Sequence, residues 1–188
     1  MTHNRQWIIV ICTVGLIAGL PVSGFCGDTP PQKGSQLPAL SLDTPVDQKD
    51  RDYLGIPEQK HFDLADVKSD LIMLEVIGVY CPQCHKQRPH INRLFHRVQK
   101  DAHLADKIKF IGIAAGATPM EVAYLVKEAH VPYPVVADEH FVAHQLLRNP
   151  RTPFNLVVTK QGRVLWAHLG IIEDMSAFLA TLKKLAAE

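Results

Sequence analysis

The sequence predicts an α/β fold in which a central mixed sheet is flanked by helices. Two apolar runs, residues 71–80 and 107–116, are typical of strands buried on both faces of a sheet. The segments between predicted strands repeat apolar residues at helical spacing, and such alternation places helices on both faces of one sheet. The last two strands are joined by a short turn and must run antiparallel. From residue 71 the predicted order is therefore β-α-β-α-β-α-β-β-α.

Short elements precede this sheet. Residues 27–36 are rich in Pro, Gly and polar side chains and are predicted to form a linker. Residues 37–42 are expected to form a first short strand and 43–60 a loop. Residues 61–70 follow with a short strand and one helical turn. We therefore predict one domain over 37–188, with an N-terminal strand extension and a central βα insert.

Three amphipathic helices are predicted from residue 82 onward, and the second begins at a capping box of Thr118 and Glu121 with Pro119 at the first helical position. A short strand and a short helix follow over 134–147. The apolar runs on either side of residues 159–162 indicate a hairpin. The predicted apolar stripes of the three helices are Ile91, Leu94, Phe95 and Val98; Val122, Leu125, Val126 and Ala129; and Met175, Phe178, Leu179, Leu182 and Leu185.

The first 26 residues have the pattern of a signal peptide or of an N-terminal membrane anchor. Arg5 precedes an apolar run of about 14 residues, which is short of the ~18 that span a bilayer. Cys12 lies inside that run and is an apolar filler. Lipidation at Cys26 is a further alternative, but Phe25 stands where a small residue is expected. We therefore expect the domain to lie outside the cytoplasm, in the bacterial periplasm.

Charge and composition are ordinary for a globular protein. The 188 residues carry a formal net charge of +1, which gives no electrostatic argument for nucleic acid or for an anionic membrane surface. The hydrophobic content is 47%. Without the N-terminal segment, about 160 residues remain, which suits a single domain.

One motif satisfies two patterns at once. Residues 81–85, CPQCH, match both the C-x-x-C-H of c-type haem attachment and the C-x-x-C redox dithiol. Cys81 is predicted to lie where a buried strand ends and a helix begins. Unpaired N–H groups and the helix dipole stabilise a thiolate there, so we expect the pKa of Cys81 to fall. Cys84 lies one turn further on, where it can attack a mixed disulfide formed by Cys81.

The alternatives to a dithiol lack support elsewhere in the sequence. A zinc site needs a second Cys or Cys/His pair at suitable spacing, and none follows. A haem needs a distal ligand and an apolar pocket, usually in a small helical domain, whereas this motif follows a strand. His85 is then an ordinary residue on the first helical turn. His140 and His144 have metal-ligand spacing, but no third ligand is near them, so we expect surface histidines and no metal or other cofactor.

Residues 37–188 resemble the TlpA-like branch of the thioredoxin superfamily, which comprises extracytoplasmic thiol–disulfide oxidoreductases. The resemblance is carried by CPQC at 81–84, by Pro89 where thioredoxins have a helix-kinking proline, and by Thr152-Pro153 before an apolar strand. Residues 160–170 are similar to the family's last turn and strand. Residues 109–138 are similar to the strand–helix–strand insert of TlpA-like and peroxiredoxin-like proteins.

The resemblance implies a thioredoxin-like fold and a function. Cys81 is implied to be the nucleophile and Cys84 the resolving thiol, and the two form the redox disulfide. Pro153 is implied to be a cis-proline that faces the dithiol, and Thr152 and Pro153 to bind the substrate chain. Thr152 resembles reducing and isomerising members. We therefore expect a monomeric reductant with protein disulfide substrates and a membrane electron donor; cytochrome maturation is one family role.

Glu75 interrupts the buried strand six residues before Cys81. Thioredoxin has an acid at the matching position, under the dithiol, whereas TlpA-like relatives often have Asn there. We expect a buried carboxyl with a raised pKa that accepts the proton of Cys84, rather than a solvent-facing edge residue. Some reductive relatives have Glu three residues after the second cysteine, and this chain has Gln87 there, so Glu75 is a candidate for that proton role.

Two other functions remain as alternatives. A thioredoxin-like peroxidase would use Cys81 as the peroxidatic cysteine, but peroxiredoxins have Thr or Ser where this chain has Gly78. A non-catalytic binding module would keep the two cysteines permanently paired. The direction of electron flow depends on the potential of the pair against its compartment, and the sequence does not determine it.

Overall fold

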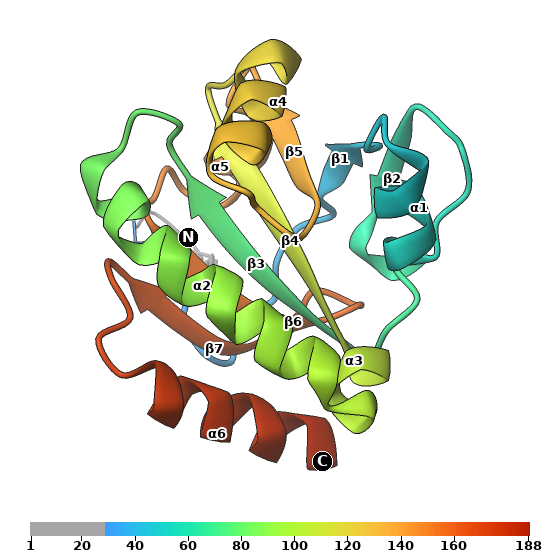
Figure 1. Ribbon diagram of the computed structural model, residues 1–188, viewed down its shortest axis with the longest axis vertical. Coiled ribbons are helices and arrows are strands. Elements are labelled where there is room, and N and C mark those ends of the chain that lie inside the picture. The colour runs from blue at the N-terminus through green and yellow to red at the C-terminus, as the bar shows by residue number, and fades with distance from the viewer. Residues whose placement is uncertain (1–28) are drawn as a thin grey trace, which may run out of the picture.

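The computed structural model describes residues 29–188, and the predictions for the signal peptide, Cys12 and Cys26 lie outside these residues. A five-stranded mixed sheet forms the centre of the domain (Figure 1). Its strand order is β5-β4-β3-β6-β7, with β3, β4 and β5 parallel to one another and β6 and β7 antiparallel to their neighbours. The strands are β3 (Leu71–Ile77), β4 (Ile108–Ala115), β5 (Val135–Asp138), β6 (Phe154–Thr159) and β7 (Val164–Leu169).

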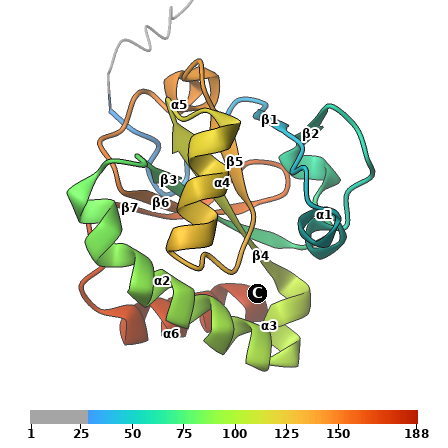
Figure 2. The ribbon, with the colours of Figure 1, turned by 45° about the horizontal axis from the view of Figure 1, so that its top comes forward.

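Two helical layers cover the sheet, as the alternating pattern predicts. On one face lie α2 (Pro82–Lys100), α3 (Ala102–Lys107) and α6 (Met175–Ala187). On the other lie α1 (Gln48–Leu54), a small hairpin of β1 (Ser41–Asp43) and β2 (His61–Asp63), a 3₁₀ turn (Leu64–Asp66) and α5 (Val142–Leu146). Helix α4 (Pro119–Glu128) packs along β5 at the edge of the sheet (Figure 2).

The central strand β3 is buried along its whole length, because apolar side chains point to both faces. Leu71, Met73 and Ile77 pack in the core beneath α2 and α6. The alternate residues of β3 pack in the second core, beneath α1 and α5. Residue 75 shares the α2 side with its odd-numbered neighbours, since side chains alternate along a strand. The one charged residue of β3 is therefore directed toward α2, the helix that contains Cys84 and begins directly after Cys81.

One expectation about the N-terminal half is wrong. Residues 43–60 are not all loop, because α1 forms within them. Asp47 caps its first turn by accepting a hydrogen bond from the Lys49 N–H, and Gly55 ends it in the left-handed conformation. The first strand also begins later than expected, at Ser41. Residues of the predicted linker lie against the sheet, since the Gly34 N–H donates to the Val164 carbonyl at 2.8 Å.

Local sequence signals correctly locate the start of α4 and the turn between β6 and β7, whereas α3, between α2 and β4, was not predicted. The Thr118 and Glu121 side chains each bond to the other's backbone N–H, which is the predicted capping box of α4. The Gly162 N–H donates to the Thr159 carbonyl at 2.8 Å and closes the predicted hairpin turn. Pro89 lies inside α2, as the resemblance implies.

A glycine between β4 and α4 tests how tightly this region is packed. Gly116 has a φ of +70°, and a Cβ there would lie 2.2 Å from the Phe141 ring. Gly34 also has a positive φ, +90°, but a Cβ there would meet nothing within 4 Å. We expect Gly34→Ala to cost about 1 kcal/mol from the backbone alone. Gly116→Ala adds a steric clash and should cost about 3 kcal/mol in urea unfolding. Equal losses for the two variants would show that the Phe141 contact is not tight.

Candidate redox site

The first cysteine of the motif lies at the N-terminus of α2. Cys81 is the N-cap residue, and its Sγ accepts a hydrogen bond from the Cys84 N–H at 3.3 Å. A turn of residues 78–81 links β3 to the helix, with the Cys81 N–H donating to the Gly78 carbonyl at 3.1 Å. Cys81 is partly exposed, whereas Cys84 is 1% exposed, and both thiols are free. The predicted placement of Cys81 at a strand–helix junction is therefore confirmed.

The Thr152-Pro153 peptide bond is cis and faces the cysteines. The Cys81 thiol donates to the Thr152 carbonyl at 3.4 Å. Strand pairing explains this proximity, because Val76 near the end of β3 pairs with Phe154 at the start of β6. Two segments 71 residues apart in sequence thus meet at one end of the sheet.

The surroundings make the two thiols chemically different. Burial alone raises the pKa of Cys81, but hydrogen bonds from the Cys84 thiol, the Thr152 side chain and two backbone N–H groups outweigh it and lower that pKa. Burial and the hydrogen bond with Cys81 raise the pKa of Cys84 to about 12. A thiolate at the first position is therefore favoured, and the second thiol keeps its proton. This asymmetry suits a nucleophile and a resolving group.

Glu75 is buried beneath α2, with 2% of its surface exposed. Its Oε1 accepts a hydrogen bond from Gln87 Nε2 at 2.9 Å, and its Oε2 accepts one from the Tyr133 hydroxyl at 2.7 Å. Burial raises the pKa of this carboxyl, although both hydrogen bonds and the Arg88 charge oppose the shift. The side chain is thus buried, as the sequence predicts, and does not face solvent.

Gln87 holds the buried polar groups together. Besides its bond to Glu75, its Nε2 lies 3.2 Å from Asn155 Oδ1, and its Oε1 accepts the Ile172 N–H at 2.8 Å. Gln87 and Asn155 are both fully buried. The residue that replaces the glutamate of some relatives is therefore a structural link among α2, β3, β6 and the segment before α6.

Sequence reasoning missed Tyr133 and Asn155 as members of this site. Asn155 carried a usable signal, because it is a polar residue inside an apolar strand, as Glu75 is. Tyr133 gave none, since an aromatic residue beside prolines is compatible with ordinary core packing. Burial raises the pKa of Tyr133 well above its usual value, and the nearby charges of Glu75 and Cys84 raise it further. The Tyr133 hydroxyl is bonded to Glu75, and Tyr133 packs in the same core as Cys84.

A groove of about 590 Å³ lies beside the dithiol, between α4 and the start of α2. Tyr80, directly before Cys81, and Met120 and Tyr124 on α4 line it and are strongly exposed. The Tyr80 hydroxyl donates to Glu121 at 2.7 Å and fixes one wall. Arg88 lines the inner end of the groove, 8% exposed, with one guanidinium nitrogen lacking a hydrogen-bond partner.

The histidines do not form a metal centre in the part of the chain that the structure describes. No group of three or more His, Cys, Asp or Glu side chains in residues 29–188 could hold a metal ion. His144 Nε2 lies 2.9 Å from the Pro150 carbonyl, and His140 is exposed. His85 is exposed beside the dithiol and its Nδ1 lies 2.9 Å from an Arg88 nitrogen.

The fold and the dithiol together define a thioredoxin-like protein, and solved structures show the same fold. The thioredoxin domain of a thiol-disulfide oxidoreductase from Bacteroides vulgatus matches with a TM-score of 0.61 at 15% identity, over 82% of this chain and 97% of its own. A secreted disulfide oxidoreductase of Mycobacterium tuberculosis matches with a TM-score of 0.56 at 16% identity, over 77% and 95%. At these identities the likeness establishes the fold alone.

Curated sequences add a more specific likeness. The thiol-disulfide oxidoreductase ResA of Bacillus cereus strain ZK is 24% identical over 113 residues, which is 60% of this chain and 62% of that protein. ResA of Halalkalibacterium halodurans is 20% identical over 113 residues, 60% and 61% of the two chains. The match therefore spans less than two thirds of these relatives. No family model matches. The relatives and neighbours support the resemblance to TlpA-like thioredoxin-superfamily oxidoreductases.

Substitution of Glu75 should change how stability depends on pH. A carboxyl whose pKa is raised by folding keeps its proton in the native state while the unfolded chain releases it. This contribution to stability is lost as pH rises from the unfolded pKa of about 4.5 through the folded one. Glu75→Gln removes the loss, so the variant's free energy of unfolding should rise relative to wild type by up to about 1.4 kcal/mol per pH unit in that window.

Urea unfolding across the pH range measures this difference, with Glu58→Gln on the exposed loop after α1 as the matched control. The control should track the wild type at every pH. A wild-type-minus-Glu75→Gln difference that stays constant above pH 4.5 would contradict a raised pKa for Glu75.

Proposed function

We propose that this protein is a thiol–disulfide oxidoreductase that exchanges disulfides with extracytoplasmic protein partners. The observation that carries the proposal is the asymmetry of its two thiols. Cys81 is partly exposed with a lowered pKa, whereas Cys84 is buried with a pKa of about 12. The names of the matched relatives support the same activity.

The reaction has two balanced steps. The Cys81 thiolate attacks one sulfur of a partner disulfide, so that a Cys81–partner disulfide forms and the other partner sulfur leaves as a thiolate. Cys84 then loses its proton and attacks Cys81 Sγ. The Cys81–Cys84 disulfide forms, and the second partner sulfur leaves. Two electrons pass from the dithiol to the partner, and the released partner thiolates take up protons.

Glu75 is proposed to accept the proton of Cys84. A thiol with a pKa of about 12 needs a base close by, and Gln87 cannot act as one. Glu75 lies on the side of β3 that faces α2, the helix that contains Cys84, and Tyr133, which donates to Glu75, packs in the same core as Cys84. The raised pKa of Glu75 suits reversible protonation better than an ordinary carboxyl pKa does.

The cis-proline loop is proposed to hold the partner chain. The Thr152 carbonyl lies 3.4 Å from Cys81 Sγ, so an extended segment that follows this backbone would bring its cysteine to the thiolate. The groove lined by Tyr80, Met120 and Tyr124 would take an apolar partner side chain next to that cysteine. Thr152 and Pro153 therefore act in binding and orientation.

We propose that the protein acts as a reductant, so that electrons flow from its dithiol to the partner disulfide. Thr152 before the cis-proline resembles reducing and isomerising members of the family more than strong oxidants. In an oxidising compartment such a dithiol needs a membrane electron donor to return it to the reduced state. The sequence pattern of residues 1–26 supports that location, as a cleaved signal or as a tether. In residues 29–188 no helix is long and apolar enough to cross a membrane.

Serine substitutions separate the two cysteines. Cys81→Ser should reduce insulin-disulfide turnover, measured with a chemical reductant, to the rate of that reductant alone, because the attacking thiolate is gone. Cys84→Ser should accumulate a covalent Cys81–partner complex on non-reducing gels, because nothing resolves it. The Cys81→Ser/Cys84→Ser double variant is the control and should trap nothing.

Retained turnover in both single variants would refute the mechanism. If the wild-type protein is inactive and its Cys81–Cys84 disulfide stays closed, the protein is instead a non-catalytic binding module.

A further inference from the structure

The solvent-facing side of α2 carries positive charge and no negative charge. The helix contains no Asp or Glu along its 19 residues. Its exposed side chains include His85, His96 and the basic stripe, which we define as Lys86, His90, Arg93, Arg97 and Lys100. The whole chain has a net charge of only +1, so this face reflects segregation of charge and not an excess of it.

The spacing of the basic stripe places its members in one line. Steps of four, three, four and three residues keep them on one side of a helix. At 1.5 Å per residue the stripe is about 21 Å long. It begins two residues after Cys84 and runs away from the dithiol along the helix. Any protein seated over Cys81 is therefore positioned to extend along it.

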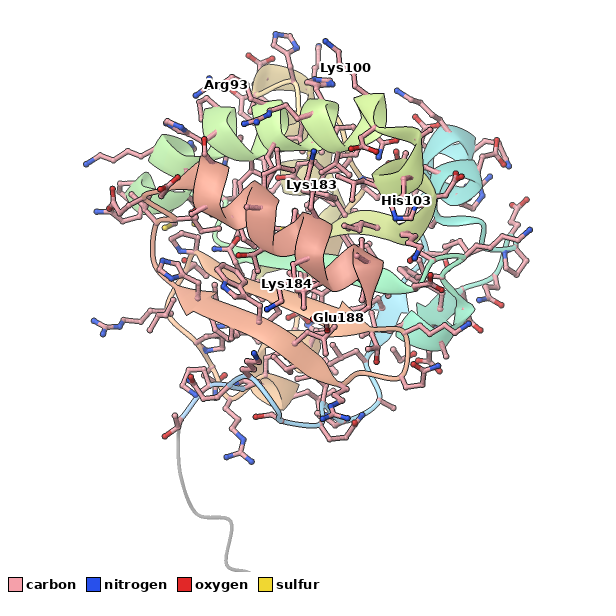
Figure 3. The ribbon with its side chains drawn as sticks, turned by 90° about the horizontal axis from the view of Figure 1, so that it is seen from below. Arg93, Lys100, His103, Lys183, Lys184 and Glu188 are labelled. Carbon is pink, nitrogen blue, oxygen red and sulfur yellow. The ribbon has the colours of Figure 1, made fainter. Side chains whose placement is uncertain are left out.

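No acidic side chain of the described residues is in direct contact with the basic stripe. Within residues 29–188 no Asp or Glu forms an ion pair with a member of the stripe, and Lys183 of α6 pairs with Asp101 at 3.6 Å. Arg93 lies 3.1 Å from His90 Nδ1, which is no acid. Figure 3 shows Arg93 and Lys100 on α2, with Lys183 on the neighbouring α6. Asp101, the residue after the stripe, therefore pairs with a lysine of α6 and not with a member of the stripe.

The middle of the basic stripe contains a small recess. His90, Arg93 and Arg97, together with Leu94 and Met175, line a cavity of about 130 Å³ between α2 and α6. Two guanidinium groups beside an imidazole are suited to a carboxylate, which a guanidinium binds with two parallel hydrogen bonds.

We propose that the basic stripe is the docking surface for an acidic redox partner, a protein whose carboxylates lie along it while its disulfide meets Cys81. The inference rests on the proposed function, since the partner is the one that exchanges disulfides. Complementary charge of this kind accelerates encounter and selects among partners.

A membrane surface fits this face less well. Interfacial binding combines basic residues with apolar side chains that enter the lipid. The large apolar side chains that are exposed in the described residues all lie outside α2, α3 and α6. They are Val46, Tyr80, Met120, Tyr124, Phe141, Val142, Leu146 and Leu169.

The test compares two synthetic peptides, each with one cysteine held as a mixed disulfide with a neutral thiopyridine. One peptide carries several Glu residues, and the other carries Gln at the same positions. The rate of thiopyridine release by the reduced protein, with Cys12 and Cys26 replaced by serine so that only Cys81 and Cys84 can react, should be about tenfold higher for the acidic peptide at low salt. The preference should vanish at about 1 M ionic strength, where the Debye length is about 3 Å.

Neutral substitutions show which residues cause the preference for the acidic peptide. Arg93→Gln/Arg97→Gln/Lys100→Gln should abolish the preference and leave the rate with the Gln peptide unchanged. Lys33→Gln/Lys160→Gln/Arg163→Gln removes the same charge from exposed sites on the N-terminal segment and the β6–β7 turn, and should keep the preference. Thermal unfolding by circular dichroism verifies that both variants are folded.

Three results would overturn the docking proposal. These are equal rates for the two peptides, a preference that survives in the α2 variant, and co-sedimentation with phosphatidylglycerol vesicles that depends on the same three residues. Failure of the proposed function is a different outcome, because the protein would then release thiopyridine from neither peptide. In that case, anisotropy with fluorescent serine versions of the peptides decides the docking proposal, and equal affinities would overturn it.

Discussion

The site depends on one interaction, the contact of Cys81 Sγ with the start of α2 on one side and with the cis-proline loop on the other. Sγ accepts the Cys84 N–H at 3.3 Å and donates to the Thr152 carbonyl at 3.4 Å. The first contact needs a helix that begins one short turn after a buried strand. The second needs β6 to pair antiparallel with β3, so that its first residues lie at the same end of the sheet. The central sheet therefore determines the chemistry of this sulfur.

The second thiol depends on a different part of the molecule. Cys84 lies on the buried side of α2, in the hydrophobic core, and its raised pKa follows from that burial and from its hydrogen bond with Cys81. Below it, Gln87 joins Glu75 to Asn155, and Tyr133 completes the hydrogen bonds of Glu75. A buried carboxyl is costly unless it is hydrogen-bonded or protonated. This one has two donors and a raised pKa, so it can change protonation state without leaving the core.

Much of the fold and of the site could be predicted from the sequence, because the patterns that indicate them lie within short segments. The apolar run ending near Cys81, the capping box at Thr118 and the buried setting of Glu75 all follow from neighbouring residues. Helix α1 was missed because its buried side chains, Arg51 and Leu54, do not form an apolar stripe. Tyr133 could not have been found, since its role arises from a contact with Glu75, 58 residues away. The net charge of +1 likewise gave no sign of the basic stripe on α2. The stripe can be identified only when the exposure of each side chain is known.

The central claim is that the fold separates the pKa values of two neighbouring thiols. Titration of the reduced Cys12→Ser/Cys26→Ser protein by ultraviolet thiolate absorbance measures this directly, because Cys81 and Cys84 are then its only thiols. The account predicts a first thiolate below the free cysteine pKa of about 8.5, absent in Cys81→Ser. The second thiolate should appear only near pH 12 and be absent in Cys84→Ser. Two results would contradict the account. One is that both thiols titrate together near pH 8.5, and the other is that the first thiolate disappears in Cys84→Ser but persists in Cys81→Ser.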